Sequence, residues 1–214
     1  MRSMSRLSRL APWSGFACAA FFIAATAIVV SSPSHADSDA AWIANYTGTA
    51  NLIGHTASGI LLIYFALSLL IFLVHLHSRV QALRPTSSLP LAAAAAAAAC
   101  MAAGGVVIGS ISYSLLVAHQ GEPTPGVDLI RQFDNLGLGL VALAGMPLVA
   151  LAIATLSWQA HQAHFFGKPL TILGFLTLLV LLIAANFVPI IIILAWIVVA
   201  AVKLLRTPAA APSA

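Results

Sequence analysis

The chain has 214 residues, of which 61% are hydrophobic and only 7% are charged, and its mean hydropathy is +1.04. Soluble globular domains carry roughly 25% charged residues, so this composition excludes a soluble fold and indicates that lipid is the solvent for most of the chain. The formal net charge of +4 comes from nine cations spread along the whole sequence, so no nucleic-acid partner is expected.

Apolar stretches of membrane-spanning length follow one another along the chain. A hydrocarbon core of about 30 Å needs about 20 helical residues, and we expect spans at residues 13–32, 52–76, 89–117 and 136–158. A last apolar stretch runs from Leu170 to Val202. As one helix rising about 1.5 Å per residue, this stretch would be about 50 Å long, which exceeds an ordinary bilayer.

The last stretch is therefore predicted to form two short helices, at residues 170–185 and 189–205. A tight Asn186-Phe187-Val188-Pro189 break would join them, because proline lacks a helical N–H and disfavours helix at the residue before it. Each half is slightly short for a full span. Both therefore either cross a thinned bilayer or form a re-entrant hairpin, and the two alternatives leave the C-terminus on the same side.

The basic residues predict the topology, because Lys and Arg near span ends accumulate on the cytoplasmic side. With two crossings at the end, eight of the nine cations fall inside, namely Arg2, Arg6, Arg9, Arg79, Arg84, Lys168, Lys203 and Arg206. The sequence thus predicts an all-α bundle of six transmembrane helices in the cytoplasmic membrane, with both termini cytoplasmic. We expect one domain over residues 1–207 and a disordered tail over 208–214.

The segments outside the spans are expected to be short connectors. Ser34-His35-Ala36 match a small-x-small cleavage site after a basic leader and an apolar run, so removal of the first span as a signal peptide is an alternative to its retention. Asp128 is expected to cap the fourth helix. Arg131 lies three residues from both Asp128 and Asp134, a spacing that favours an ion pair within one helix.

Charged residues are absent from the interior of every predicted span, which argues against a transporter or pump that works by charge relay. Four histidines gather at the inner ends of the second and fourth spans. Haem ligation by two histidines needs one on each of two helices at matching depth, and His75 and His161 satisfy that requirement. Anchoring of the span ends at the interface is the simpler interpretation, in which no cofactor is bound.

Glycine and proline mark further structural features. Gly105 and Gly109 form a GxxxG pair, which favours close approach of two helix backbones, here within one chain rather than between copies. Pro147 predicts a kink in the fourth helix, and Pro189 marks the break described above. No serine elbow, phosphate-binding loop, zinc spacing or pair of intramembrane carboxylates is found, so we expect no enzyme activity.

The order of these elements resembles a family of small polytopic membrane proteins of unknown function from actinobacteria and related bacteria. The likeness runs from the basic leader through "SDAAWIANYTGTANLIGHTASG" and "VDLIRQFDNLGLGL" to the closing "NFVPIIIILAWIVVAAVKLLR". The resemblance implies six spans and a retained first helix, and it assigns no functional residue.

The leading interpretation is a non-enzymatic integral membrane protein. It would be either an accessory subunit that packs against a membrane-protein partner or a second copy, or a binder of a small molecule. The alternatives are a haem-binding redox protein that uses His75 and His161 and a transporter of neutral or apolar molecules.

Overall fold

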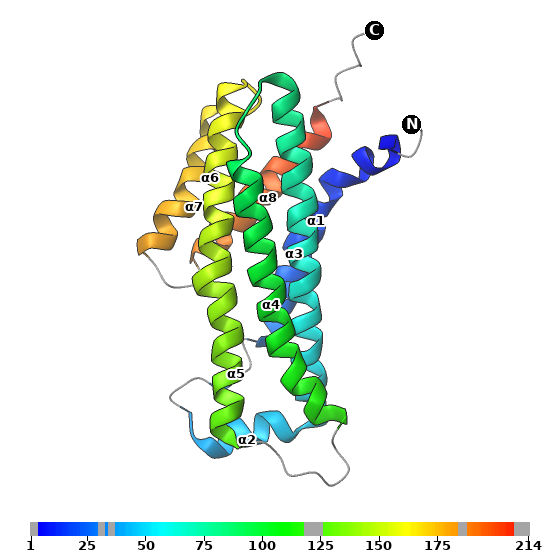
Figure 1. The fold of residues 1–214 in the computed structure, drawn as a ribbon, viewed down its shortest axis with the longest axis vertical. Coiled ribbons are helices and arrows are strands. Elements are labelled where there is room, and N and C mark those ends of the chain that lie inside the picture. Colours follow the sequence, from blue (N-terminus) through cyan, green and yellow to red (C-terminus); the bar gives the residue numbers. More distant parts are fainter. Residues whose placement is uncertain (1–3, 30–32, 34–36, 118–125, 184–187, 208–214) are drawn as a thin grey trace. The chain divides into compact units, whose positions relative to one another are not determined.

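The structure is a computed structural model, and it describes residues 4–29, 33, 37–117, 126–183 and 188–207. The elements follow in the order α1 (Met4–Val29), α2 (Asp39–Thr47), α3 (Thr49–Leu83), α4 (Leu89–Val117), α5 (Val127–Gly139), the π-helical η1 (Leu140–Gly145), α6 (Met146–Gln162), α7 (Lys168–Ile183) and α8 (Val188–Arg206) (Figure 1). The all-α prediction is therefore confirmed for the described part of the chain. The proposed cleavage site at 34–36 and the tail at 208–214 lie outside it.

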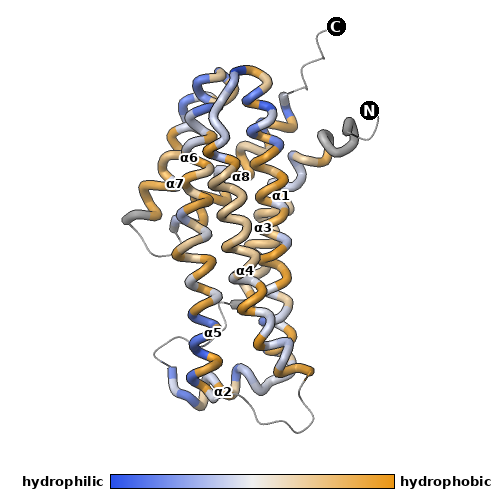
Figure 2. The backbone as a smooth tube through the Cα atoms, viewed as in Figure 1, coloured by the Kyte–Doolittle hydropathy of each residue, from blue (hydrophilic) through white to orange (hydrophobic). Residues whose placement is uncertain are grey.

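Five helical segments are long and apolar enough to cross a membrane, namely Leu10–Ile28, Thr49–Leu83, Leu89–Val117, Val127–Gln162 and Pro189–Arg206. The apolar helix Lys168–Leu181 is shorter. Hydrophobic residues line the middle of the helices, and hydrophilic residues lie near the helix ends and in the first turns of α5 (Figure 2). The chain is thus a multi-pass membrane protein.

The fourth span is longer than predicted, because α5, η1 and α6 continue directly into one another from Val127 to Gln162. The helix begins at Val127, and the N-cap is Gly126 without a side-chain capping bond. The expectation that Asp128 caps this helix was therefore wrong. Asp128 lies in the first turn instead, where a carboxylate still interacts favourably with the helix dipole.

The last apolar stretch forms two helices, α7 and α8. Residues at the start of α7 (Pro169 and Leu170) and near the end of α8 (Val199 and Lys203) line the same groove, so the two helices run antiparallel. Pro189 is the second residue of α8, and at the start of a helix its missing N–H breaks no intrahelical bond. Residues 186 and 187 of the predicted break lie outside the described residues.

The chain forms two compact units. Unit 1 comprises Met1–Ala19, Ser68–Ala96 and Pro147–Ala214, and unit 2 comprises Ala20–Leu67 and Ala97–Met146. Each long helix before α6 contributes to both units, and the chain passes from unit 2 to unit 1 between Met146 and Pro147.

The core of unit 1 surrounds Trp196 of α8, which is fully buried. Its indole packs edge-on against Phe72 of α3 at a centroid distance of 6.5 Å and against Phe166 at 6.0 Å. Helix α1 comes close at Gly15, where an added Cβ would lie 3.0 Å from the Cβ of Ala201 and from the ring of Phe72. Aromatic rings therefore fill the space that the small residues leave between these helices.

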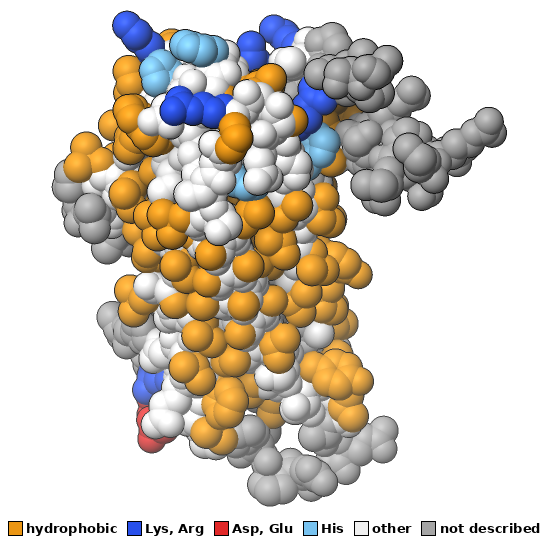
Figure 3. Space-filling model, turned by 45° about the horizontal axis from the view of Figure 1, so that its top comes forward, with side chains coloured by type: hydrophobic (Ala, Val, Ile, Leu, Met, Phe, Trp, Pro, Cys, Tyr) orange, Lys and Arg blue, Asp and Glu red, His pale blue; other side chains and the backbone are white. Residues whose placement is uncertain are grey.

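One end of unit 1 holds its basic side chains. Arg79 at the end of α3 donates a hydrogen bond to the carbonyl oxygen of Thr207 after α8, at 3.0 Å. Gln159 of α6 donates to the hydroxyl of Ser87, just before α4, at 3.0 Å. The ends of α3, α6 and α8 and the start of α4 thus meet there, and Lys, Arg and His side chains gather on the surface (Figure 3). We call Arg79, Arg84, Lys168, Lys203 and Arg206 the basic rim.

Glycines bring the helices of unit 2 into backbone contact. A Cβ built at Gly59 of α3 would overlap the carbonyl oxygen of Gly105 and lie 2.8 Å from the Cα of Gly109, both on α4. On another face of α4, a Cβ at Gly104 would lie 2.8 Å from the carbonyl oxygen of Gly137 on α5. The structure thus places the GxxxG pair against a third glycine of the same chain.

The π-helical segment η1 directly precedes Pro147, the residue at which we expected a kink. The N–H of Met146 bonds to the carbonyl oxygen of Val141, five residues earlier instead of four. Proline has no N–H for an intrahelical bond and its ring crowds the carbonyl one turn earlier, so a wider turn at this point accommodates it. The helix continues through Pro147 into α6.

Candidate functional site

Helix α2 forms where the sequence analysis expected only a connector. Ser38 caps it, since its hydroxyl accepts a hydrogen bond from the N–H of Ala41 at 3.3 Å. Trp42 and Tyr46 are one helical turn apart and therefore share a face, and both are buried. Together with Leu52 of α3, Ile111 and Leu115 of α4 and Ile130 of α5, they form one hydrophobic cluster. Helix α2 thus lies across the end of unit 2 (Figure 1).

Flat side chains stack in a column through this end of unit 2. The guanidinium carbon of Arg131 lies 5.6 Å from the ring centroid of Trp42. The rings of Trp42 and Tyr46 are 6.2 Å apart with planes 9° from parallel, and those of Tyr46 and His55 are 4.9 Å apart with planes 8° from parallel. The column joins α5, α2 and α3, so it defines the position of α2 on the bundle.

Two hydrogen bonds connect polar side chains of α2 to the long helices. The hydroxyl of Tyr46 donates to Oδ1 of Asp134 at 3.1 Å, and the amide of Asn45 lies 2.8 Å from Nε2 of His55. Asp134 is 7% exposed and His55 is 4% exposed. Burial, followed by the charge of Asp134 and the hydrogen bond to it, raises the pKa of the Tyr46 phenol. Tyr46 therefore stays protonated and acts as a donor.

Three buried polar atoms of α3 and α4 have no hydrogen-bond partner in the part of the chain that the structure describes. They are Nδ1 of His55, Oγ1 of Thr56 and Oγ of Ser112. Ser112 lies one turn after Gly109 on the face of α4 that meets α3, the helix that carries the other two. Leaving a buried polar atom without a partner costs about 1–3 kcal/mol, so such atoms indicate unused binding capacity. We call Asn45, Tyr46, His55, Thr56, Ser112 and Asp134 the α2 polar site.

The rim of the α2 polar site is an ion pair between α2 and α5. Arg131 lies 2.8 Å from Oδ1 of Asp39, and its guanidinium also donates to the carbonyl oxygen of Asp37 at 3.0 Å. The sequence spacing predicted an ion pair of Arg131 with Asp128 or Asp134, whereas the ion pair in the described part of the chain joins it to Asp39. The presence of α2 explains the difference, because packing brings this helix against α5.

Removing Arg131 should destabilise unit 2 more than removing its ionic partner. Asp39→Asn should lower the free energy of unfolding by less than about 1 kcal/mol, because the Asp39 side chain is 72% exposed. Arg131→Gln also removes the stacking on Trp42 and the bond to Asp37, so we expect a larger loss of about 2 kcal/mol. Thermal unfolding in detergent measures both, and equal losses would contradict the role given to the stacking.

The burial of Asp134 was not predicted from the sequence. With the fourth span placed at 136–158, this carboxylate lay outside it, whereas the structure places Asp134 inside the apolar helix Val127–Gln162. This helix has 36 residues, more than one span needs, and Asp134 lies near its start, so the expectation that no charged residue lies well inside a span stays a prediction. The spacing carried a signal, because Ile130, Asp134 and Gly137 recur at three- and four-residue intervals and are the buried positions of α5.

The two histidines of the haem hypothesis have separate surroundings within unit 1. Nδ1 of His161 lies 3.4 Å from the carbonyl oxygen of Phe166, and its ring lies 6.2 Å from that of Trp158. His75 is partly exposed, whereas His77 is buried. Among the described residues, no hydrogen bond or ring contact joins His75 to His161, and no group of three or more His, Cys, Asp or Glu is arranged to hold a metal ion. Haem binding stays a prediction.

The comparisons with known proteins assign neither a family nor a fold to this chain. No protein-family model, curated protein or solved structure matches it. The resemblance to the bacterial membrane-protein family therefore stays a prediction, and any function has to be inferred from the geometry.

Proposed function

We propose that this chain is a six-span, non-enzymatic protein of the cytoplasmic membrane that binds a small neutral molecule at the α2 polar site. One observation carries the proposal: Nδ1 of His55, Oγ1 of Thr56 and Oγ of Ser112 are buried and have no hydrogen-bond partner among the described residues. A ligand that bonds to these atoms would recover the free energy that their burial costs.

The donors of the site favour an oxygen-bearing neutral ligand. The amide nitrogen of Asn45 faces Nε2 of His55, so Nε2 accepts and the neutral imidazole carries its proton on Nδ1. This N–H and the hydroxyls of Thr56 and Ser112 can all donate to a carbonyl or hydroxyl oxygen. A ligand with only N–H donors, such as an amidinium, offers no acceptor for the imidazole N–H.

The access route in this proposal is helix α2. It carries Asn45 and Tyr46 of the site, and polar and ionic contacts hold it on the bundle as well as apolar packing. Because Asn45 and Tyr46 belong both to α2 and to the network, displacement of α2 would open the site and change its hydrogen bonds together. In this proposal a ligand enters when α2 moves away, and the hydrogen bonds of its polar side chains break at the same time.

A pair of isosteric probes tests the ligand class. Acetamide presents a carbonyl oxygen, and acetamidinium has the same shape but carries a positive charge. In ligand-observed saturation-transfer NMR we expect binding of acetamide and none of acetamidinium. Ser112→Ala should weaken acetamide binding roughly 3–10-fold by removing one hydrogen bond.

Ser110→Ala is the matched control for this experiment. Ser110 is on the same helix, but it is exposed and bonds to the carbonyl oxygen of Val107 in its own helix. This variant should bind acetamide as the unmodified protein does. Equal signals from the Ser112→Ala and Ser110→Ala proteins, or no signal from the unmodified protein, would overturn the assignment.

The antiparallel arrangement of α7 and α8 supports the topology in the proposal. Lys168 begins α7 and Lys203 lies in the last turn of α8, and the groove residues show that these two ends are adjacent. Whether the pair crosses fully or forms a re-entrant hairpin, the chain returns to the side from which it left. The positive-inside tendency makes that side the cytoplasm.

Single cysteines test this topology in intact cells. In a background without Cys18 and Cys100, we expect Thr207→Cys and Gly167→Cys to react with a membrane-impermeant maleimide only after permeabilisation. Asp37→Cys should react without permeabilisation of the cells. Reaction of the Thr207 variant in unpermeabilised cells would contradict a cytoplasmic C-terminus.

A further inference from the structure

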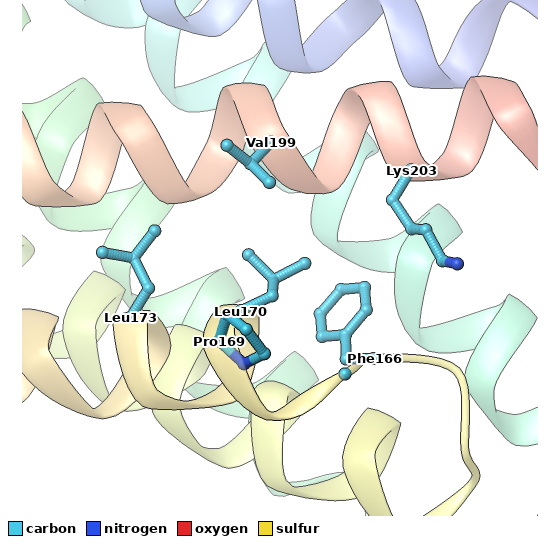
Figure 4. Close-up of a pocket in the computed structure, with 7 residues that line it drawn as sticks. Phe166, Pro169, Leu170, Leu173, Val199 and Lys203 are labelled. Atoms are coloured by element: carbon cyan, nitrogen blue, oxygen red, sulfur yellow. The ribbon is translucent and has the colours of Figure 1, made fainter.

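The start of α7 and the end of α8 leave a groove between them within unit 1. Its volume is about 460 Å³, and its lining is Phe166, Gly167, Pro169, Leu170, Leu173, Val199 and Lys203. Val199 and Lys203 of α8 face Pro169, Leu170 and Leu173 of α7 across the groove, with Phe166 at the end near Lys203 (Figure 4). The groove is thus apolar except for one ammonium group.

The shape and lining of the groove suit a hydrocarbon chain. Phe166 is buried against Trp196, whereas Val199 is 48% exposed, so the groove has a packed floor and an open side. Ligand pockets typically have about 300–1,000 Å³, and this groove falls within that range. Both helices belong to the apolar part of the chain, where the surrounding solvent is lipid.

The charge distribution specifies what the polar end of such a ligand should be. The five carboxylates of the chain are Asp37, Asp39, Glu122, Asp128 and Asp134, and all of them lie outside the residues of unit 1. Eight of the nine cations lie within unit 1, since only Arg131 belongs to unit 2. Unit 1 therefore contains no carboxylate side chain that could pair with Lys203, so an anion at this lysine would come from its surroundings.

We propose that this groove binds an anionic phospholipid, with one acyl chain along the apolar lining and the phosphate at Lys203. The lipid belongs to the leaflet that faces the basic rim. Lys203 is exposed at the mouth of the groove, and Lys168 and Arg206 are close to it along α7 and α8. The N-terminal end of α7, at Lys168, adds a partial positive charge at the same end of the groove. Basic pockets between membrane helices favour anionic head groups in this way.

Native mass spectrometry with two lipids of identical acyl chains tests the proposal. We expect the detergent-purified full chain to retain phosphatidylglycerol in preference to phosphatidylcholine. Lys203→Gln should reduce that preference about fivefold, because one lysine near a phosphate changes the affinity for an anionic lipid by about that factor. Val199→Phe should reduce retention of both lipids by filling the groove.

Arg84→Gln provides the matched control, because Arg84 is an exposed member of the basic rim, follows α3 and does not line the groove. It should keep the preference for phosphatidylglycerol. Equal losses from the Lys203 and Arg84 variants would assign the effect to diffuse charge and overturn the groove as a site. Equal retention of both lipids by the unmodified protein would overturn it too. Both residues are exposed, so their variants should unfold at the same temperature as the unmodified chain.

Discussion

Replacing Gly59 by alanine should lower the free energy of unfolding by about 3 kcal/mol, the largest effect that we expect from a single methyl group in this chain. The added Cβ would overlap the carbonyl oxygen of Gly105 and lie 2.8 Å from the backbone of Gly109. These neighbours are main-chain atoms of α4 and have no rotamers through which to move aside. Relief would therefore require α3 and α4 to separate, with loss of packing along their length.

Gly139→Ala is the control for this prediction. No atom of the described residues lies within 4 Å of a Cβ built at Gly139, so the methyl group meets open space. Because alanine has the higher helix propensity, we expect a change between zero and a gain of about 1 kcal/mol. Thermal or denaturant unfolding in one detergent compares the two variants. A Gly59→Ala protein as stable as the Gly139→Ala protein would show that the backbones of α3 and α4 are not in contact.

Replacing Asp134 by alanine should release α2 from the end of unit 2. The change leaves the buried hydroxyl of Tyr46 without the acceptor that it has at 3.1 Å, and this costs about 2 kcal/mol. Asp134→Asn should be milder, because the amide oxygen still accepts from Tyr46. Hydrogen exchange followed by mass spectrometry measures the effect directly, as faster exchange of the α2 amides at 39–47 with little change in unit 1.

A double-mutant cycle separates this hydrogen bond from other effects at Asp134. Tyr46→Phe removes the donor and keeps the ring that stacks on Trp42 and His55. If the pair acts through the bond, Tyr46→Phe combined with Asp134→Ala should cost less than the sum of the two single changes. Strict additivity would mean that Asp134 stabilises this end of unit 2 through other contacts.

Composition and hydropathy alone determined that the chain is helical and crosses the membrane several times. A 61% hydrophobic chain has to place its apolar surface in lipid, and in lipid a helix satisfies every backbone polar group within one segment. The separation of the last stretch at Pro189 is equally local, because a missing N–H acts on the turn that contains it.

The sequence indicated one half of the glycine contact between α3 and α4, and the tertiary structure supplied the other half. The GxxxG spacing at Gly105 and Gly109 indicated a close helix contact, since it depends only on which residues share a helix face. Their partner, Gly59, lies far away in the sequence and belongs to no motif. Only the packing of α3 against α4 identifies it.

The candidate site was decided by the tertiary structure. The polar residues of the site come from four helices: Asn45 and Tyr46 from α2, His55 from α3, Ser112 from α4 and Asp134 from α5. None has a neighbour in the sequence that would mark it as polar and buried. Arg131 of α5 likewise pairs with Asp39 of α2, although Asp128 and Asp134 lie about one turn away from it on α5 itself. Hydropathy and helical periodicity report the average environment of a segment, whereas burial of a single polar group depends on which helix packs over it.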